Sequence, residues 1–196
     1  MDRIPSALER ALERVEKLGK ASQEDLQRSR FVEEGQKLAA QYLNGEANLR
    51  AELNKYEDGP ERAGLTEGLE EILIRNLALP TSESAKDRNR LAMDGLKLTK
   101  KDPGAVENVF SRMRQVFNHY TGQGEMQRKE AYENLKRDLQ MRLSQTARQQ
   151  GMPPIDLQHI ESHPQFQMEW RKTRAQLESQ YDLYMKEYKE QLSSLA

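Results

Sequence analysis

The feature that most constrains this chain is a helical hydrophobic period, interrupted at intervals by Gly- and Pro-containing breaks. The first segment spaces its apolar residues in steps of four and three, at Ile4, Leu8, Ala11, Val15 and Leu18. This spacing places apolar side chains on one face of an α-helix. No segment between the breaks alternates with period two for more than a few residues, so no strand is predicted. The chain is therefore predicted to be all-α.

The breaks combine Gly or Pro with a polar neighbour, a combination that ends helices and starts turns. They fall at 19–22, 58–60, 80, 102–104, 122–124 and 151–154. The intervals predict six or seven helices, of which the second (23–57), the sixth (125–150) and the last (165–195) are long. Asn44-Gly45 is a turn pair within the second helix, and Gly costs about 1 kcal/mol in a helix interior. We expect one helix with a weak point there.

The helices differ in how much of their surface is apolar. Segment 60–79 carries Leu and Ile around a wide arc, which predicts the most buried helix. Spacing near 3.5 residues in the sixth and last helices favours coiled-coil-like packing. We expect an elongated bundle that forms a single domain over 1–196. Its predicted parts are a docked N-terminal helix (1–20), a helical core (22–150), a Pro- and His-containing connector (151–163) and a long C-terminal helix (164–196).

The composition narrows the compartment and the classes of partner. Thirty-one Lys and Arg balance 32 Asp and Glu, for a net charge of −1, so no global field attracts nucleic acid or anionic lipid. The absence of Cys removes disulfides, thiolate nucleophiles and Cys metal sites. No apolar run approaches the roughly 18 residues that span a membrane, and the first 20 residues lack the apolar core of a signal peptide. We expect a cytoplasmic protein without membrane association.

The best candidate for site chemistry is segment 156–163, which holds two of the three histidines. His159 and His163 are four residues apart, so a helical turn would place them on one face, near Asp156 and Glu161. These residue types bind divalent metals, although their order differs from the HExxH motif. His119 could join from the fifth helix. The competing and favoured interpretation is a connector whose side chains cap the neighbouring helices. No cofactor is predicted.

The last helix supplies the candidate interaction residues, which are Trp170, Tyr181, Tyr184 and Tyr188. The tyrosines are spaced by three and four residues, as core packing predicts. Tyr and Trp are also enriched at protein–protein interfaces. Both interpretations remain open, and Phe166 is subject to the same alternatives.

A basic cluster ends the fourth predicted helix, at Lys97, Lys100 and Lys101, with Arg88 and Arg90 upstream. One interpretation is a contact with phosphate or nucleic acid. The other, which is favoured, is the stabilising placement of cations at a helix C-terminus.

These patterns rank three functions. The first is a non-enzymatic helical protein for protein–protein interaction, a scaffold or adaptor whose partner is another protein or a second copy in a homodimer. It ranks first because long amphipathic helices outweigh any site chemistry. The second is a metal-dependent helical enzyme that uses segment 156–163. The third is a nucleic-acid-associated protein that uses the 88–101 face. No catalytic residue is assigned, because no GxSxG elbow or phosphate-binding glycine loop occurs.

Overall fold

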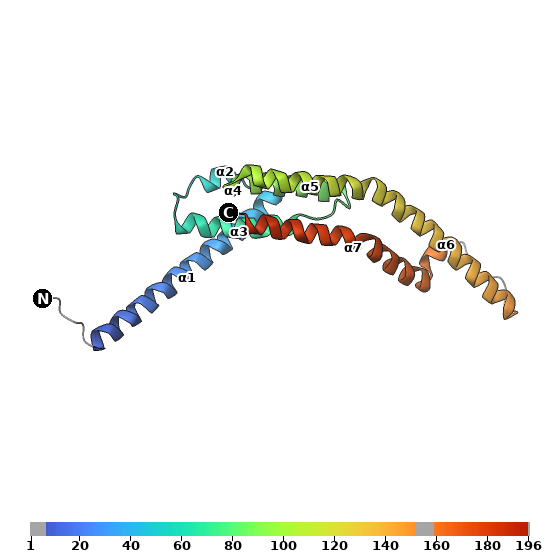
Figure 1. Ribbon diagram of the computed structural model, residues 1–196, viewed down its shortest axis with the longest axis horizontal. Coiled ribbons are helices and arrows are strands. Elements are labelled where there is room, and N and C mark those ends of the chain that lie inside the picture. The colour runs from blue at the N-terminus through green and yellow to red at the C-terminus, as the bar shows by residue number, and fades with distance from the viewer. Residues whose placement is uncertain (1–6, 152–158, 196) are drawn as a thin grey trace. The chain divides into compact units, whose positions relative to one another are not determined.

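The computed structural model describes residues 7–151 and 159–195, and for residues 7–24 it describes only the helical backbone. Within these ranges every regular element is a helix and no strand occurs, which confirms the predicted all-α class. The elements are α1 (Ala7–Leu43), α2 (Leu49–Leu53), α3 (Pro60–Asn76), α4 (Glu83–Thr99), α5 (Pro103–Thr121), α6 (Gln123–Gln149), the 3-10 turn η1 (Ile160–Ser162) and α7 (Pro164–Ser194) (Figure 1). None of the helices in the described ranges is both long and apolar enough to cross a membrane.

The chain divides into two compact units, each built from segments that are not consecutive. Unit 1 comprises residues 1–77, 87–106 and 192–196, and unit 2 comprises residues 78–86 and 107–191. The division falls within α4, α5 and α7. The expectation of a single domain stays a prediction.

In unit 1, α1 and α3 run side by side in the same direction (Figure 1). Two glycines allow their backbones to touch. A Cβ at Gly68 would lie 2.0 Å from the carbonyl oxygen of Val32, and one at Gly35 would lie 2.1 Å from that of Leu65. Any larger residue at either position would therefore push the two helices apart.

Polar contacts flank the same helix pair. Arg28 pairs with Glu67 at 2.8 Å, and Gln36 donates a hydrogen bond to Glu71 at 2.7 Å. From the first contact to the second, the residue number increases on both α1 and α3, as expected for parallel helices. The helix is not buried all round, because α3 presents exposed Glu67 and Glu71 on the face opposite its buried leucines.

The predicted break at residues 19–22 is wrong, because α1 continues through it from Ala7 to Leu43. Residues 7–20 of the first predicted helix and residues 23–43 of the second therefore belong to one helix. Gly19 is followed by Lys, Ala and Ser rather than by proline, so the glycine costs only about 1 kcal/mol and does not stop the helix. The side chains of the apolar stripe from Leu8 to Leu18 lie outside the described residues.

The expectation that the second predicted helix runs on to residue 57 is also wrong, because α1 ends at Leu43. Gly45 has a φ of 79°, the left-handed conformation that commonly follows a helix end. Its amide donates to the carbonyl of Tyr42, and the amide of Glu46 donates to the carbonyl of Gln41. This pair of bonds is a Schellman motif. A new helix, α2, begins after Asn48, whose side chain accepts from the amide of Ala51 at 3.1 Å.

Unit 2 holds the end of α5, all of α6 and most of α7. Its fully buried cluster joins α6, η1 and α7 through Leu139, Ile160 and Phe166. Ion pairs between Lys136 and Glu161, and between Arg142 and Glu169, flank the cluster. The 3-10 turn before α7 is thus fastened to α6 by one apolar and one charged contact.

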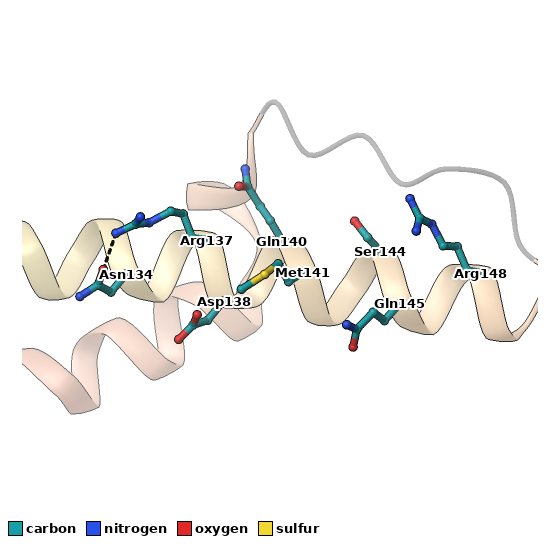
Figure 2. Close-up of a pocket in the computed structure, with 8 residues that line it drawn as sticks. All are labelled: Asn134, Arg137, Asp138, Gln140, Met141, Ser144, Gln145 and Arg148. Atoms are coloured by element: carbon teal, nitrogen blue, oxygen red, sulfur yellow. Dashed lines mark hydrogen bonds between the residues drawn. The ribbon is translucent and has the colours of Figure 1, made fainter.

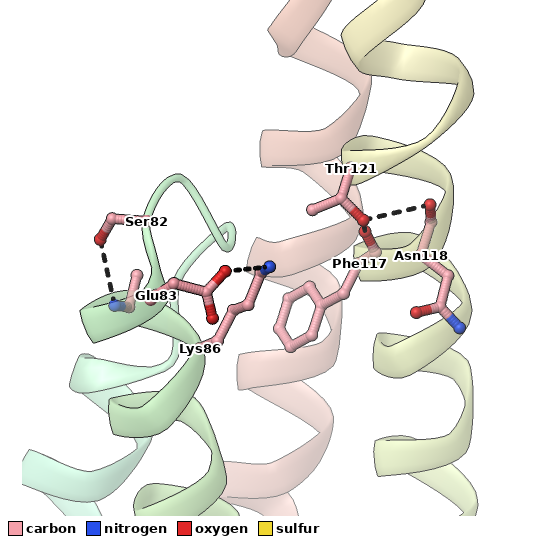
Figure 3. Close-up of polar contacts among 7 residues, drawn as sticks. Ser82, Glu83, Lys86, Phe117, Asn118 and Thr121 are labelled. Carbon is pink, nitrogen blue, oxygen red and sulfur yellow. Dashed lines mark hydrogen bonds and ion pairs between the residues drawn. The ribbon is translucent and has the colours of Figure 1, made fainter.

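Local side-chain hydrogen bonds lie at two helix ends in unit 2 (Figure 3). The hydroxyl of Ser82 accepts from the amide of Ala85 at 3.2 Å and caps the first turn of α4. At the end of α5, the hydroxyl of Thr121 donates to the carbonyl of Phe117 at 3.0 Å. The Ser82 bond satisfies an amide that a helix leaves unpaired at its start, whereas the Thr121 bond is a second donor to a carbonyl of the last turn.

Candidate functional site

A groove of about 320 Å³ lies between α6 and α7, within unit 2. The α6 residues that line it recur in steps of three, one, three and one, so they form one stripe along that helix. The α7 residues are one turn apart. The lining, which we call the α6–α7 groove, consists of Glu125, Arg128, Lys129, Tyr132, Glu133, Trp170 and Arg174.

An aromatic pair forms the apolar wall of this groove. The rings of Tyr132 and Trp170 meet edge to face, with centroids 5.0 Å apart and an interplanar angle of 88°. Tyr132 makes a second edge-to-face contact with Phe166 at 5.1 Å, and Phe166 is buried. Edge-to-face contacts favour a defined ring orientation. Trp170 is therefore held at the surface by a rigid aromatic base rather than left free to rotate.

Two of the charged residues in the lining are paired with carboxylates. Lys129 lies 2.7 Å from Glu125, and this hydrogen bond lowers the pKa of the Glu125 carboxyl. Arg174 lies 3.0 Å from Glu178, whose hydrogen bond raises the pKa of the Arg174 guanidinium. Both pairs link residues one helical turn apart, so they also stabilise their own helices.

Arg128 has a different environment. Its guanidinium carbon lies 3.9 Å from the ring centroid of Tyr120, a cation–π distance. Its Nη2 donates to the carbonyl of Tyr120 at 3.0 Å, while its buried Nη1 has no hydrogen-bond partner within the described ranges. The side chain of Arg128 is thus fixed in place without a carboxylate bonded to it.

A polar network behind Arg128 fixes the end of α5 against α7. The Tyr120 hydroxyl donates a hydrogen bond to Glu178 at 3.0 Å. Burial is the larger cause, and this hydrogen bond the second cause, of the raised pKa of Tyr120. The Tyr181 hydroxyl lies 2.7 Å from Nδ1 of His119. Gly124 leaves room for that hydroxyl, because a Cβ there would lie 2.6 Å from it. The network is a rigid support for the groove.

The predicted interaction residues fall into different environments. Trp170 lines the groove, whereas Tyr181 and Tyr188 are each only 9% exposed. Tyr184 is 40% exposed and stacks on Tyr188, with centroids 6.5 Å apart. Sequence reasoning did not single out Arg128 or Tyr132 as site residues, because their importance depends on which α7 residues face them.

The predicted metal ligands surround η1. The Glu161 carboxylate pairs with Lys136, whose hydrogen bond lowers the pKa of Glu161. Nδ1 of His163 accepts from the amide of Gln165 at 3.2 Å. His159 precedes η1, and Asp156 lies outside the described residues. Within the described ranges no group of three or more His, Asp or Glu residues is placed to hold a metal ion, and the metal site stays a prediction.

The basic cluster at the end of α4 is not a continuous cationic face. The Lys100 side chain is only 3% exposed and its Nζ lies 2.8 Å from Glu70. It also donates to the carbonyl of Leu195. Lys100 is therefore unable to contact a phosphate at the surface. This corrects the interpretation that it belongs to a nucleic-acid contact.

A second hollow, of about 840 Å³, lies along α6 (Figure 2). Its described lining comes entirely from that helix and comprises Asn134, Arg137, Asp138, Gln140, Met141, Ser144, Gln145 and Arg148. Arg137 donates to the side chain of Asn134 rather than toward a shared centre. Because side chains on one helix diverge, these residues do not converge on a common point, and we assign no site there.

Comparison with known proteins adds a family but no activity. The family described as "Family of unknown function (DUF6657)" matches residues 50–194, which include every residue of the α6–α7 groove. No curated protein matches the chain. No solved structure matches it either.

Proposed function

Because the chain belongs to the Family of unknown function (DUF6657), we propose its function from its own residues. It is a non-enzymatic helical protein that binds another protein chain through the α6–α7 groove. The observation that carries this proposal is the Tyr132–Trp170 pair at the groove surface, in a lining that also holds Arg128 from α6 and Arg174 from α7. Trp, Tyr and Arg are the residues that most often dominate the binding energy of protein interfaces.

The rigidity of the groove supports the same proposal. Phe166 fixes Tyr132 from below, and the Tyr120 ring and carbonyl fix Arg128. Side chains that are already ordered lose little conformational entropy when a partner binds. A rigid aromatic and cationic surface is therefore suited to recognition.

We also propose the finer architecture that the sequence pattern suggests, an elongated bundle with coiled-coil-like packing of α6 against α7. The support is the apolar spacing near 3.5 residues in both helices. A cytoplasmic location is part of the proposal and is supported by the absence of Cys. The partner is either a second copy or a different protein.

Site-specific photo-crosslinking tests the binding surface. A photoreactive amino acid replaces Lys129, an exposed residue of the groove, or Arg137, which lies about two turns further along α6 and outside it. We expect a discrete crosslinked protein band from position 129, and its loss when Trp170→Ala is added. Equal bands from both positions, or a band at 129 that survives Trp170→Ala, would contradict the proposal.

Sedimentation of the purified protein over a wide concentration range identifies the class of partner. A mass that rises with concentration and returns to the monomer value in Trp170→Ala indicates a second copy in the groove. A monomer at all concentrations, together with the crosslink from position 129, indicates a different protein.

A further inference from the structure

We infer that the α6–α7 groove recognises an acidic segment of a partner protein, which brings a carboxylate to Arg128 and Lys129 and an apolar side chain to Trp170. This inference rests on the proposed function and specifies the partner chemistry. The first evidence is the charge of the lining, which holds three cations and two carboxylates.

Among the three cations of the lining, Arg128 is the one with no carboxylate bonded to it within the described residues. Glu125 interacts electrostatically with both Lys129 and Arg128, so one carboxylate serves two cations. The second carboxylate, Glu133, lies near Lys136, which is outside the groove and forms its ion pair with Glu161. Arg174 is compensated by Glu178. A carboxylate of a ligand would therefore meet Arg128, which has no bonded carboxylate, and the exposed Lys129 beside it on α6.

These two cations would act in different ways. Arg128 is fixed against Tyr120 and its Nη1 is buried, so it provides a stationary positive potential rather than a new hydrogen bond. The side chain of Lys129 is 74% exposed and has donor capacity beyond its bond to Glu125. A carboxylate would then hydrogen-bond to Lys129 in the field of Arg128, and charge-assisted bonds of this kind are the stronger class.

The aromatic wall explains why the ligand is a peptide segment rather than a bare anion. Trp170 and Tyr132 present apolar surface beside the cations. Among the described residues, neither the Trp170 indole N–H nor the Tyr132 hydroxyl has a hydrogen-bond partner. An acidic segment with a neighbouring aliphatic or aromatic residue would pack against the rings of Trp170 and Tyr132. It would also supply acceptors to the indole N–H and the tyrosine hydroxyl. Electrostatic complementarity of this type contributes specificity and speeds association.

Trp170 is the only tryptophan in the chain, so its fluorescence reports directly on this groove. The full-length protein is titrated with a short peptide of Glu and Leu, and with two counterparts in which Gln or Lys replaces Glu. We expect the Glu peptide to shift or quench the emission with saturation, and the Gln and Lys peptides to bind at least about fivefold more weakly. Added salt should weaken the Glu peptide's binding further.

Variants locate the effect. Lys129→Gln should weaken binding of the Glu peptide by about fivefold or more, because it removes an interfacial charge and its hydrogen bond. Arg128→Gln should do the same, with thermal melting used to show that the protein remains folded. Arg137→Gln removes a cation of the same helix that lies outside the groove and should leave binding unchanged.

The outcomes separate this inference from the proposed function. Equal binding of the Glu and Gln peptides, or preference for the Lys peptide, would overturn the acidic partner while leaving the groove as a peptide-binding surface. A Glu-peptide affinity that Lys129→Gln and Arg128→Gln leave unchanged would overturn it as well. If none of the peptides changes the emission, the inference is wrong, and the crosslinking experiment alone decides whether the groove binds protein.

Discussion

Lys100 forms a buried ion pair with Glu70 in unit 1, with Nζ 2.8 Å from Oε2 and side chains 3% and 18% exposed. The Lys100 ammonium also donates to the carbonyl of Leu195. A buried pair adds little net stability compared with an apolar pair, but removal of one partner strands the other charge. The Lys100 side chain thus joins the end of α4 to α3 and to Leu195, which directly follows α7.

Lys100→Met should lower the free energy of unfolding by about 3 kcal/mol, because Glu70 loses its counter-ion in a largely buried position. Urea unfolding measures the change. Arg28→Met is the matched control, since Arg28 and Glu67 form an exposed pair in the same unit and should contribute less than about 1 kcal/mol. Equal losses in both variants would show that the burial of Lys100 has no energetic consequence.

Gly68→Ala should destabilise unit 1 more than Gly95→Ala does. The new Cβ at position 68 would meet the rigid carbonyl of Val32 at 2.0 Å, whereas at position 95 the nearest atoms are side-chain ends of Leu73 and Tyr42 at 2.9 and 3.0 Å. We expect a loss of about 3 kcal/mol or more for Gly68→Ala and about 1 kcal/mol for Gly95→Ala. Chemical denaturation tests the order, and the reverse order would refute the backbone contact between α1 and α3.

Gly124→Ala and Tyr181→Phe should be strongly non-additive. The alanine Cβ would lie 2.6 Å from the Tyr181 hydroxyl, and Tyr181→Phe removes that oxygen. Each single substitution should destabilise the protein, the second because it leaves His119 without its 2.7 Å partner. In the double variant the clash with this hydroxyl is absent, so its loss should be smaller than the sum of the single losses. A double-mutant cycle from thermal melting measures this coupling, and strict additivity would argue against the contact.

Acid should weaken unit 2 through Glu161 and Glu169. Hydrogen bonds from Lys136 and Arg142 lower the pKa of these carboxyls in the folded protein. Their contribution is therefore present above the unfolded value of about 4.3 and is lost as the pH falls through the lower folded values. Melting temperatures measured from pH 7 down to acid should fall less steeply for Lys136→Gln/Arg142→Gln than for the wild type. Arg137→Gln serves as the control, and parallel curves for all three proteins would contradict the assignment.

The sequence predicted the all-α class because apolar spacing and proline placement are local signals. Pro60 and Pro103 open α3 and α5 as their position at a helix start implies. The two errors in α1 have one cause, the treatment of glycine by propensity alone. The helix continues through Gly19 because the neighbouring residues are helical. It ends before Gly45, because Gly45 adopts a positive φ that allows the two Schellman hydrogen bonds to form.

The candidate site was predictable only in part. The type of Trp170 and its place on the last helix predict an interaction residue; the structure places it in the groove lining, and its role stays a prediction. Arg128 and Tyr132 could not be identified in the same way, because the groove depends on the register between α6 and α7, a long-range property. Lys100 shows the converse limit, since its neighbours in sequence give no sign that it points inward to Glu70.

Unit 1 combines segments from both ends of the chain, and this has a consequence for folding during protein synthesis. Its segments include residues 192–196 as well as the first 77, and Leu192 is fully buried. A nascent chain that has not yet extended beyond residue 191 lacks this leucine and the carbonyl that accepts from Lys100. Unit 1 therefore cannot complete its core during translation until the last turn of α7 has been synthesised.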